Sequence, residues 1–585
     1  MTDDQAQSPD EAPPPKKTLL QTLAFFGERR SLVMLGLGFA SGLPYMLIFD
    51  TLSLWLRDAG LSLAVIGFFS LATLSFSFKF LWAPLIDRTK LPFLHRLVGH
   101  RRAWMLACQA VIILGLLAIS TVNPAANLPL MAAIAVIVGF ATATQDIVID
   151  AWRIEVVDTD RQGQMAVAVQ WGYRGAMIMA GAVPLLLAER FGWNISYLAM
   201  AGAMLVGVIS TLAAPREQAH LIRPIHTDGV QQPKVLEILE WLARLAILLA
   251  GALLVGSGLS GDASLLSNFV GGDALAEAWK AKPNGVWLQL AGVIVGLGVI
   301  VVAAWPIPKV PTKPGVYLST ALYSPLKDFL TRFSGVAGLI LAAICVYRVS
   351  DFVLNIMNPF YRDMGFSLTE IAEIRKVFGI IASMAGVFLG GVIVARFGLM
   401  RALIVGAFAQ PISNLMFALL AMSGHSTPML FASICIDNIA GGVAGTALIA
   451  YMSSLTSAGF TATQYALFSS LYALPGKLIA SQSGRIVEAS AIAAQAGGPV
   501  GALKGLFTRL PPESFTAAGA KLGVSAAAMA AGYTAFFIYT ALIGGVAIVL
   551  SFLVAARQPR HMAAKAAAEA EARAQAEADT EVFET

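Results

Sequence analysis

Charged residues are scarce in this 585-residue chain: Asp, Glu, Lys and Arg make up 13% of it, whereas hydrophobic residues make up 57%. Soluble globular proteins carry roughly 25% charged and 45–50% apolar residues, so a set of soluble domains is excluded. The apolar residues form continuous runs of about 20 residues, unlike the alternating segments of a transmembrane β-barrel. The composition therefore predicts an all-α polytopic membrane protein.

Cysteine and histidine are also rare. The 3 cysteines stand singly in apolar segments without disulfide or metal-ligand spacing, and we expect no metal and no cofactor. All 6 histidines fall in predicted loops or the C-terminal tail, so any proton transfer inside the membrane must use carboxylates. The net charge of +5 is small for this length and indicates no nucleic-acid partner. The acidic, proline-rich residues 1–17 do not resemble a cleavable signal peptide.

Fourteen segments are long and apolar enough to span the roughly 30 Å hydrocarbon layer. They lie near residues 32–56, 65–86, 103–122, 129–152, 164–189, 194–213, 242–260, 286–305, 335–360, 369–395, 402–421, 429–452, 463–486 and 533–556. Polar, proline-containing stretches divide them into groups of six, two and six. We therefore expect a tail (1–30), a six-helix bundle (31–215), a linker region with two extra helices (216–325), a second bundle (326–556) with a periplasmic insertion (489–532), and a second tail (557–585).

Basic residues gather on one side of the predicted membrane topology. They cluster before the first span, as at Arg29 and Arg30, and in the loop after the second span. The facing loops 123–127 and 423–428 contain no Lys or Arg. Because basic loops stay in the cytoplasm, the sequence predicts that both termini are cytoplasmic.

The two six-helix groups repeat each other. Residues 55–62 (WLRDAGLS) end the first helix of one half, and residues 360–367 (FYRDMGFS) end the first helix of the other. Duplicated halves with a binding site at their interface are typical of secondary transporters. We therefore expect two six-helix bundles of the major facilitator fold, plus two extra helices.

Charged residues inside the predicted spans are distributed in the same way in both halves. A charge at the bilayer centre costs at least about 2.5–3.5 kcal/mol, so each one needs a reason. Within the two six-helix halves, the third and sixth helices carry no charge. The charged residues lie in the first, second, fourth and fifth helices, which surround the central cavity of a major facilitator: Asp50, Lys79, Asp146, Asp150 and Arg174, then Arg348, Asp351, Glu373, Arg375, Lys376, Asp437 and Lys477. Structural ion pairs between helices remain the alternative interpretation.

Asp146 and Asp150 are the favoured proton carriers. They stand one helical turn apart, with Cβ atoms about 5–6 Å from each other, and each carboxylate raises the proton affinity of the other. Asp50 and Asp351 are the reserve candidates, and Arg153 nearby supports a purely structural alternative. A cytoplasmic gate is predicted from the basic turn after the second helix of each half, with the residues Asp87, Arg88, Arg101, Arg102, Arg396 and Arg401.

Two other classes of protein stay open. The run Asp146 to Asp150 suits Mg²⁺ chelation in a membrane-embedded prenyl transferase, but the second carboxylate cluster that this chemistry needs is missing from the sequence. A receptor or scaffold with a degenerate transporter fold would be expected to lose the intramembrane charges, and they are present. We therefore expect a transporter and not an enzyme.

Several motifs resemble AmpG-type muropeptide permeases. They are Gly42–Pro44 with Ser53–Arg57, residues 79–88 (KFLWAPLIDR), 143–151 (ATQDIVIDA), 450–455 (AYMSSL) and 460–467 (FTATQYAL). The resemblance covers the twelve core helices and implies a proton-driven inner-membrane importer of anhydro-muropeptides for peptidoglycan recycling, a flux that also induces β-lactamase in some bacteria and so bears on antibiotic resistance. The insertion 489–532 departs from the family pattern, and the related acetyl-CoA transporters are the nearest alternative.

The implied cargo carries carboxylates, hydroxyls, N-acetyl groups and flat sugar faces. Arg174, Arg348 and Lys477 suit carboxylates, and Arg174 and Lys477 occupy corresponding fifth helices. Tyr173 and Tyr465 suit sugar faces. Amide side chains suit the hydroxyl and N-acetyl groups: Gln145, Asn355, Asn358, Asn438 and Gln464. The expected partners are thus a small glycopeptide substrate, protons and the lipid bilayer, and the expected state is a monomer.

Overall fold

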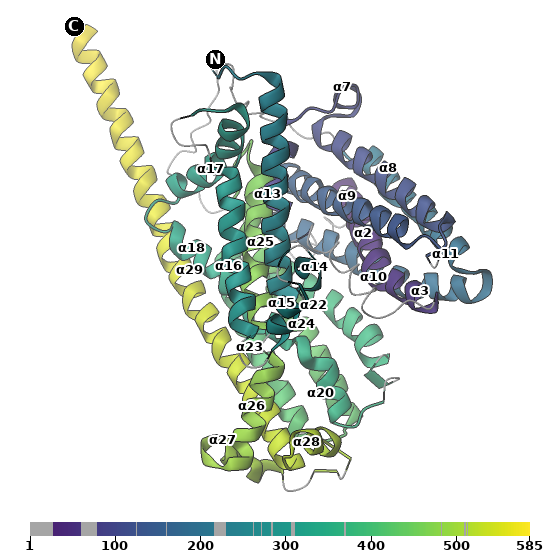
Figure 1. The fold of residues 1–585 in the computed structure, drawn as a ribbon. Coiled ribbons are helices and arrows are strands. Elements are labelled where there is room, and N and C mark those ends of the chain that lie inside the picture. Colours follow the sequence, from purple (N-terminus) through teal and green to yellow (C-terminus); the bar gives the residue numbers. More distant parts are fainter. Residues whose placement is uncertain are drawn as a thin grey trace.

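The computed structural model describes residues 27–59, 76, 79–124, 126–158, 161–215, 230–260, 263–268, 270, 272–281, 285–305, 310–367, 370–371, 373–480, 483–507, 510–511 and 513–584. Within these ranges every regular element is helical (Figure 1). Nine described helices are long and apolar enough to cross a membrane, or ten if a pair bent by 111° counts as one. The all-α membrane architecture is confirmed. Most of the predicted span 65–86 lies outside the described residues, and the count of fourteen stays a prediction.

The N-terminal half packs around its first and fifth helices. Its elements are α2 (Arg29–Met46), η2 (Leu47–Thr51), α3 (Leu52–Asp58), η4 (Lys79–Leu81), α6 (Ala83–Arg88), α7 (Leu94–Val98), α8 (His100–Thr121), α9 (Leu128–Glu155), α10 (Gln162–Phe191), α11 (Trp193–Ala203) and α12 (Leu205–Ala213). Small residues bring α2 and α10 together: a Cβ on Gly42 would lie 2.7 Å from the Tyr173 carbonyl oxygen. Such close backbone contact is how helices associate in a membrane.

Prolines inside these helices free carbonyl groups that polar side chains then use. Pro44 has no N–H, so the carbonyl of Ala40, four residues earlier, loses its helical partner, and Gln145 Nε2 donates to it at 2.9 Å. Pro184 likewise frees the carbonyl of Ala180, and the Thr51 hydroxyl donates to it at 2.9 Å. These bonds join the first helix to the fourth and fifth.

Two extra helices form a hairpin beside the bundles, followed by a polar helix. The elements are α13 (Lys234–Ser260), α14 (Ser264–Ser267), α15 (Gly272–Lys280), α16 (Gly285–Ala304) and α17 (Lys313–Arg332). Helices α13 and α16 touch through glycines, because a Cβ on Gly296 would lie 2.7 Å from the Gly251 carbonyl oxygen. Buried Arg244 donates to the carbonyl of Trp305 at 2.9 Å, just past the end of α16. The hairpin packs against Phe80 and Trp82 of the N-terminal half.

The C-terminal half repeats the helix order with a broken first helix. Its elements are α18 (Ala337–Val346), α19 (Val349–Phe352), η6 (Val353–Ile356), α20 (Met357–Asp363), η7 (Glu373–Phe378), α22 (Gly379–Phe397), α23 (Leu399–Ser423), α24 (Thr427–Ser454), α25 (Thr461–Ala480), α26 (Ser483–Ala496), α27 (Gly498–Ala502), η8 (Leu503–Phe507), α28 (Thr516–Leu522) and α29 (Ala526–Glu584). The single helix predicted at 335–360 is divided after Val346 and again at residues 353–356, and Pro359, which has no N–H to donate, lies in the first turn of α20.

The predicted insertion forms a helical cap on one end of this half (Figure 1). Phe515 is fully buried against Phe360 and Tyr533, and its N–H donates to the Asp363 carbonyl at 2.6 Å. Helix α25 ends at Ala480, before the predicted limit of 486, and α26 continues as a separate helix. The last helix begins at Ala526 and runs unbroken into the predicted tail, where Figure 1 shows it projecting beyond the bundles.

Candidate functional site

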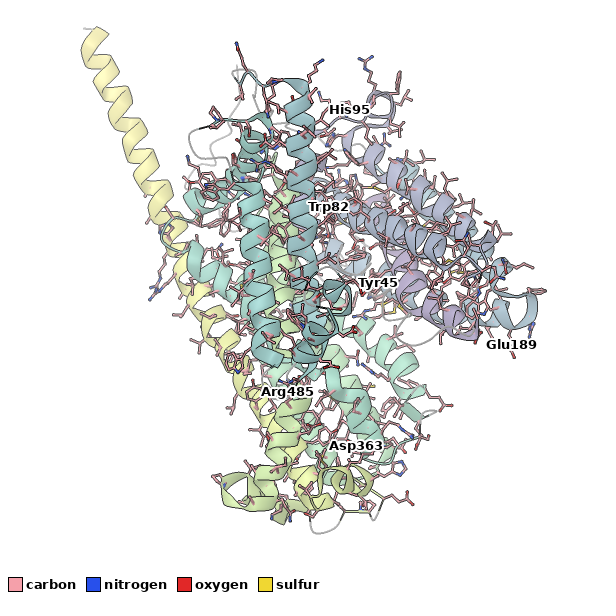
Figure 2. All side chains as sticks on the ribbon, in the orientation of Figure 1. Tyr45, Trp82, His95, Glu189, Asp363 and Arg485 are labelled. Atoms are coloured by element: carbon pink, nitrogen blue, oxygen red, sulfur yellow. The ribbon has the colours of Figure 1, made fainter. Side chains whose placement is uncertain are left out.

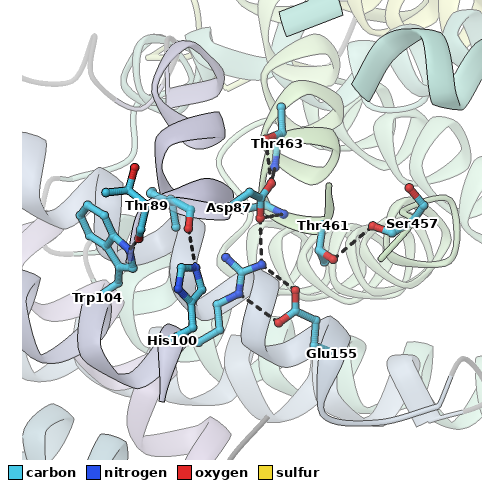
Figure 3. A network of polar contacts seen from close by, with 11 residues as sticks. Asp87, Thr89, His100, Trp104, Glu155, Ser457, Thr461 and Thr463 are labelled. Atoms are coloured by element: carbon cyan, nitrogen blue, oxygen red, sulfur yellow. Dashed lines mark hydrogen bonds and ion pairs between the residues drawn. The ribbon is translucent and has the colours of Figure 1, made fainter. Parts of the chain in front are cut away.

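The two halves are joined by a carboxylate that binds the start of a helix. Asp87, at the end of α6, is fully buried, and its Oδ2 accepts from the N–H and the hydroxyl of Thr463 at 2.9 and 2.7 Å. Its Oδ1 accepts from the Ala462 N–H at 3.2 Å (Figure 3). These N–H groups belong to the first turn of α25, where a helix has no internal partners for them and favours a negative charge.

A buried arginine holds that carboxylate in place. Arg101 Nη2 lies 2.8 Å from Asp87 Oδ1 and 2.6 Å from Glu155 Oε1, and its Nε donates to Glu155 Oε2 at 3.0 Å. The side chains of Arg101 and Asp87 have no solvent exposure. Figure 3 shows the group at the meeting point of α6, α8, α9 and α25. Because a buried charge needs a partner, this network is destabilised if any member is removed.

Closer to the molecular centre, the fifth helix of one half packs against the other half. A Cβ on Gly163 would lie 2.6 Å from Val394 Cγ1, so α10 and α22 approach closely. Trp171 Nε1 donates to the Met384 carbonyl at 2.9 Å, and Gln170 Nε2 donates to Thr446 Oγ1 at 3.0 Å. These contacts lie toward the same end as Asp87. The halves are therefore held together at the end that the basic residues predict to be cytoplasmic.

Asp146 and Asp150 on α9 have different surroundings. The Asp146 carboxylate accepts a hydrogen bond from the Ser41 hydroxyl of α2. Asp150 lies between two cations, with Lys79 Nζ at 4.0 Å and Arg153 Nη2 at 3.5 Å. Of the predicted pair, Asp150 is thus paired with cations and Asp146 is hydrogen-bonded to a hydroxyl. Lys79 lies within electrostatic reach of both carboxylates.

Aromatic side chains surround this carboxylate pair. Tyr45 lies near Asp146, and its ring centroid is 6.2 Å from that of Tyr173. Tyr472, on α25 of the other half, is within electrostatic reach of Tyr45. Figure 2 places Tyr45 midway between the end marked by His95 and the end marked by Asp363. Hydroxyls and ring faces from both halves therefore meet near the molecular centre.

Two arginines from opposite halves meet at the same depth. Arg348, between α18 and α19, forms an ion pair with Asp351. Arg174 of α10 lies within electrostatic reach of both. Among the described side chains, the polar contact of its guanidinium is Nη1 with Met177 Sδ at 3.9 Å. Asp437 of α24 adds a second carboxylate near Arg348 and Asp351. This centre is suited to an anionic, partly sugar-like molecule.

Other predicted binding residues make contacts within the protein. Gln145 binds the Ala40 carbonyl, and Asn438 Nδ2 donates to the Ile434 carbonyl at 2.9 Å. Gln464 Nε2 donates to Asp328 of α17 at 2.9 Å. Tyr465 is buried, with the Arg153 guanidinium 5.2 Å from its ring centroid. The side chains of four predicted residues lie outside the described part: Asp50, Asn355, Asn358 and Lys477.

The predicted gate residues divide into two groups. Asp87 and Arg101 belong to the network above, and the Arg88 guanidinium lies 5.7 Å from the Phe460 ring centroid of the other half. The remaining three do not join that network in the contacts described: Arg102 donates to the Ala214 carbonyl within its own half at 3.0 Å, and Arg396 and Arg401 are exposed.

Sequence reasoning missed several partners. Glu155 was not singled out, although its place five residues after Asp150 on the same helix was a usable signal. Ser41 carries no charge and gave no signal. Asp328 lies in a segment interpreted only as a linker, yet it accepts from Ser457 Oγ at 2.8 Å and fixes α17 to the start of the α25 region.

Comparison with known proteins supports one family. Residues 34–479 match the sequence model of the Major Facilitator Superfamily. The anhydromuropeptide permease of Escherichia coli (strain K12) is 30% identical over 472 residues, which are 80% of this chain and 76% of that protein. Putative transporter AmpG 4 of Rickettsia conorii is 28% identical over 77% of this chain and 88% of its own. A solved structure of a double tryptophan mutant of XylE aligns with a TM-score of 0.51 at 13% identity, over 91% of this chain and 99% of that one, and this likeness concerns the fold alone.

Proposed function

Because this chain belongs to the AmpG-type muropeptide permeases of the major facilitator superfamily, we propose that it imports anhydro-muropeptides across the inner membrane together with protons. The cargo is an N-acetylglucosaminyl-1,6-anhydro-N-acetylmuramyl unit, with or without its peptide, and the flux supplies peptidoglycan recycling. The role of muropeptide transporter rests on the relatives. The proton coupling rests on the α9 carboxylates, and the inward direction rests on the closed end of the two halves.

The observation that carries the cargo assignment is the meeting of Arg174 and Arg348. One belongs to α10 and the other to the helix break between α18 and α19, so they come from opposite halves. Only Arg348 has an ion-pair partner among the described side chains, and two guanidinium groups near each other repel. A cargo carboxylate would relieve that repulsion and accept bidentate hydrogen bonds. It would also join the two halves, which is the event that a rocking transporter needs.

Asp146 supplies the proton site in this proposal. Asp150 lies between the cations Lys79 and Arg153, whereas the Asp146 contact is the neutral Ser41 hydroxyl. A carboxylate inside the membrane without its own cation favours the protonated form. Protonation of Asp146 leaves the charge of Lys79 to Asp150 alone and lowers the negative charge beside an anionic cargo. Proton and cargo would then bind together and cross in the same direction.

The proposed direction of transport follows from which end of the protein is closed. Asp87, Thr463, Gly163 and Val394 hold the halves together at the end predicted to be cytoplasmic. In this arrangement the cargo and the proton arrive from the periplasm. Opening the inner end requires Asp87 to leave the first turn of α25. The more alkaline cytoplasm would then take the proton from Asp146, and the returning negative charge would expel the cargo.

Exchange of radiolabelled cargo for unlabelled cargo tests the substrate without any gradient. Proteoliposomes with the full chain should accumulate labelled anhydro-disaccharide and anhydro-muropeptide when loaded with unlabelled anhydro-muropeptide. Loading with acetyl-CoA or with the reducing, non-anhydro disaccharide should give no exchange. Exchange with acetyl-CoA alone would contradict the cargo assignment and favour the related acetyl-CoA transporters.

A further inference from the structure

Asp437 lies beside the central site but has no part in the function proposed above. It belongs to α24, the fourth helix of the C-terminal half. Its Oδ1 accepts from Gln410 Nε2 at 3.1 Å and from Ser413 Oγ at 3.0 Å, both on α23. Asp146 lies on α9, the fourth helix of the N-terminal half, and also accepts from a serine hydroxyl. The fourth helix of each half thus carries a carboxylate held by neutral donors.

The amide of Gln410 is incompletely satisfied. Gln410 is 1% exposed, and its Oε1 has no hydrogen-bond partner among the described residues. A buried acceptor without a donor costs about 1–3 kcal/mol. An ionised Asp437 cannot provide that donor, because a carboxylate only accepts. A protonated Asp437 carries an O–H, so the acid and the amide can exchange two hydrogen bonds. If the oxygen and nitrogen of the Gln410 amide are interchanged, the amide oxygen faces the Asp437 carboxyl. Two acceptors then face each other, so this arrangement also requires a proton between them.

The charges around Asp437 leave its carboxylate without a cation of its own. Asp351 already forms the ion pair with Arg348, so two carboxylates share that guanidinium. From the neighbouring elements, Tyr361 of α20 lies within electrostatic reach of Asp437 and of Arg375 on η7. From the other half, Arg174 of α10 faces the Arg348 and Asp351 pair. The Lys477 side chain lies outside the described part.

We propose that Asp437 binds a second exchangeable proton, shared with the Gln410 amide, in the C-terminal half. This deepens the proposed function and rests on it for the link to cargo. When a cargo carboxylate takes up Arg348, Asp351 and Asp437 both lose part of their shared cation. A proton from water then binds the Asp437 carboxylate, and Gln410 Oε1 accepts its hydrogen bond. Cargo binding at Arg348 would therefore promote proton binding at Asp437 by charge linkage.

Infrared difference spectroscopy tests the proton itself, without any cargo. The full chain in lipid nanodiscs is titrated from acidic to alkaline pH, and the C=O band of protonated carboxyl groups is followed. A component of that band should be absent in Asp437→Asn and retained in Asp146→Asn. In Gln410→Met, that component should move to higher frequency, because the acid loses its hydrogen-bond acceptor, while Ser413→Ala should leave the component in place. A spectrum unchanged by Asp437→Asn and by Gln410→Met at every pH would show that Asp437 stays ionised and would overturn the proposal.

A second measurement tests the link to cargo. Proton uptake per bound anhydro-muropeptide is recorded in weakly buffered solution with a pH-indicator dye. Asp437→Asn should lower this ratio by about half, because one of the two linked protons is lost. An unchanged ratio would contradict the proposed link. Because the infrared signal needs no cargo, a failure of the muropeptide assignment would leave that signal intact, and the two failures can be told apart.

Discussion

The Gln145 side chain donates to the carbonyl of Ala40, the group that Pro44 leaves without a helical partner. A residue selected from the sequence as a possible cargo ligand therefore joins the first helix to the fourth. Gln145 is fully buried, and its Oε1 has no partner among the described residues. The amide thus has one group committed to the fold and one still available.

A double-mutant cycle separates these two roles. Gln145→Leu should lower the free energy of unfolding by about 1–3 kcal/mol, because the Ala40 carbonyl becomes a buried, unsatisfied acceptor. In a Pro44→Ala background the helix recovers its own N–H donor, and the same substitution should cost much less. Reversible unfolding in mixed detergent micelles measures both. An equal loss in both backgrounds, accompanied by weaker cargo binding, would assign Gln145 to the cargo instead.

Asp87→Asn should weaken the closure of the inner end. The variant keeps an acceptor oxygen but loses the charge that faces Arg101 and the first turn of α25, a change of about 1.5–3 kcal/mol for charge-assisted bonds. Spin labels at the exposed positions Arg96 and Ala458, in a chain without native cysteines, should then report a larger population with a long separation. Arg401→Gln, at an exposed position outside the network, is the control. Equal distance distributions in all three proteins would show that Asp87 does not hold the halves together.

Arg174→Ala should weaken transport of peptide-bearing cargo about tenfold, since one charge-assisted contact is worth roughly 1.5–3 kcal/mol. The peptide adds carboxylates, so anhydro-disaccharide without peptide should be less affected. Equilibrium exchange measured with both cargoes gives the comparison. If binding of both cargoes is unchanged while the protein fails to accumulate in the membrane, Arg174 supports the helix packing and does not bind cargo.

The predicted topology is tested by a reporter fused after Thr585. Alkaline phosphatase, which is active only in the periplasm, should be inactive there, and a fluorescent protein that folds in the cytoplasm should be bright. The physical reason is the excess of Lys and Arg on the side where the halves are joined. Active phosphatase at this position would reverse the orientation and with it the direction proposed for transport.

The sequence identified those residues whose presence in a membrane span carries a high energetic cost. Lys79, Asp150, Arg348 and Asp351 stand out because charges are expensive inside a membrane, and the structure brings them into ion pairs near the centre. Their roles in transport stay predictions. The duplicated halves and the family could also be inferred from sequence, because the repeat and the motifs are continuous in the chain.

Other features depend on contacts between distant segments. The hydrogen bond from Gln464 Nε2 to Asp328 joins residues 136 positions apart, and neither residue type is unusual where it stands. The break near residues 353–356 could not be predicted from Pro359, because some membrane helices continue through a proline. Likewise, the Asp146 and Asp150 spacing indicated one face of one helix but could not reveal that Arg153 and Lys79 would pair with Asp150.

The two carboxylates of α9 should respond differently to neutralisation. Asp146→Asn mimics the permanently protonated form and should abolish uptake against a concentration gradient while cargo exchange continues. Asp150→Asn leaves Lys79 and Arg153 without their shared carboxylate, so it should also lower the yield of folded protein. If single and double variants still concentrate cargo, the coupling site lies elsewhere.

The most direct measurement is uptake of labelled anhydro-muropeptide into proteoliposomes under an imposed pH gradient, acidic outside. With the protein inserted so that its predicted periplasmic face is outward, the account predicts accumulation above the external concentration. An ionophore that dissipates the proton gradient should reduce uptake to simple equilibration, and Asp146→Asn should equilibrate without accumulating. Two results would contradict proton-driven import: accumulation that persists without the pH gradient, or uptake by the wild-type protein that is the same with and without the gradient.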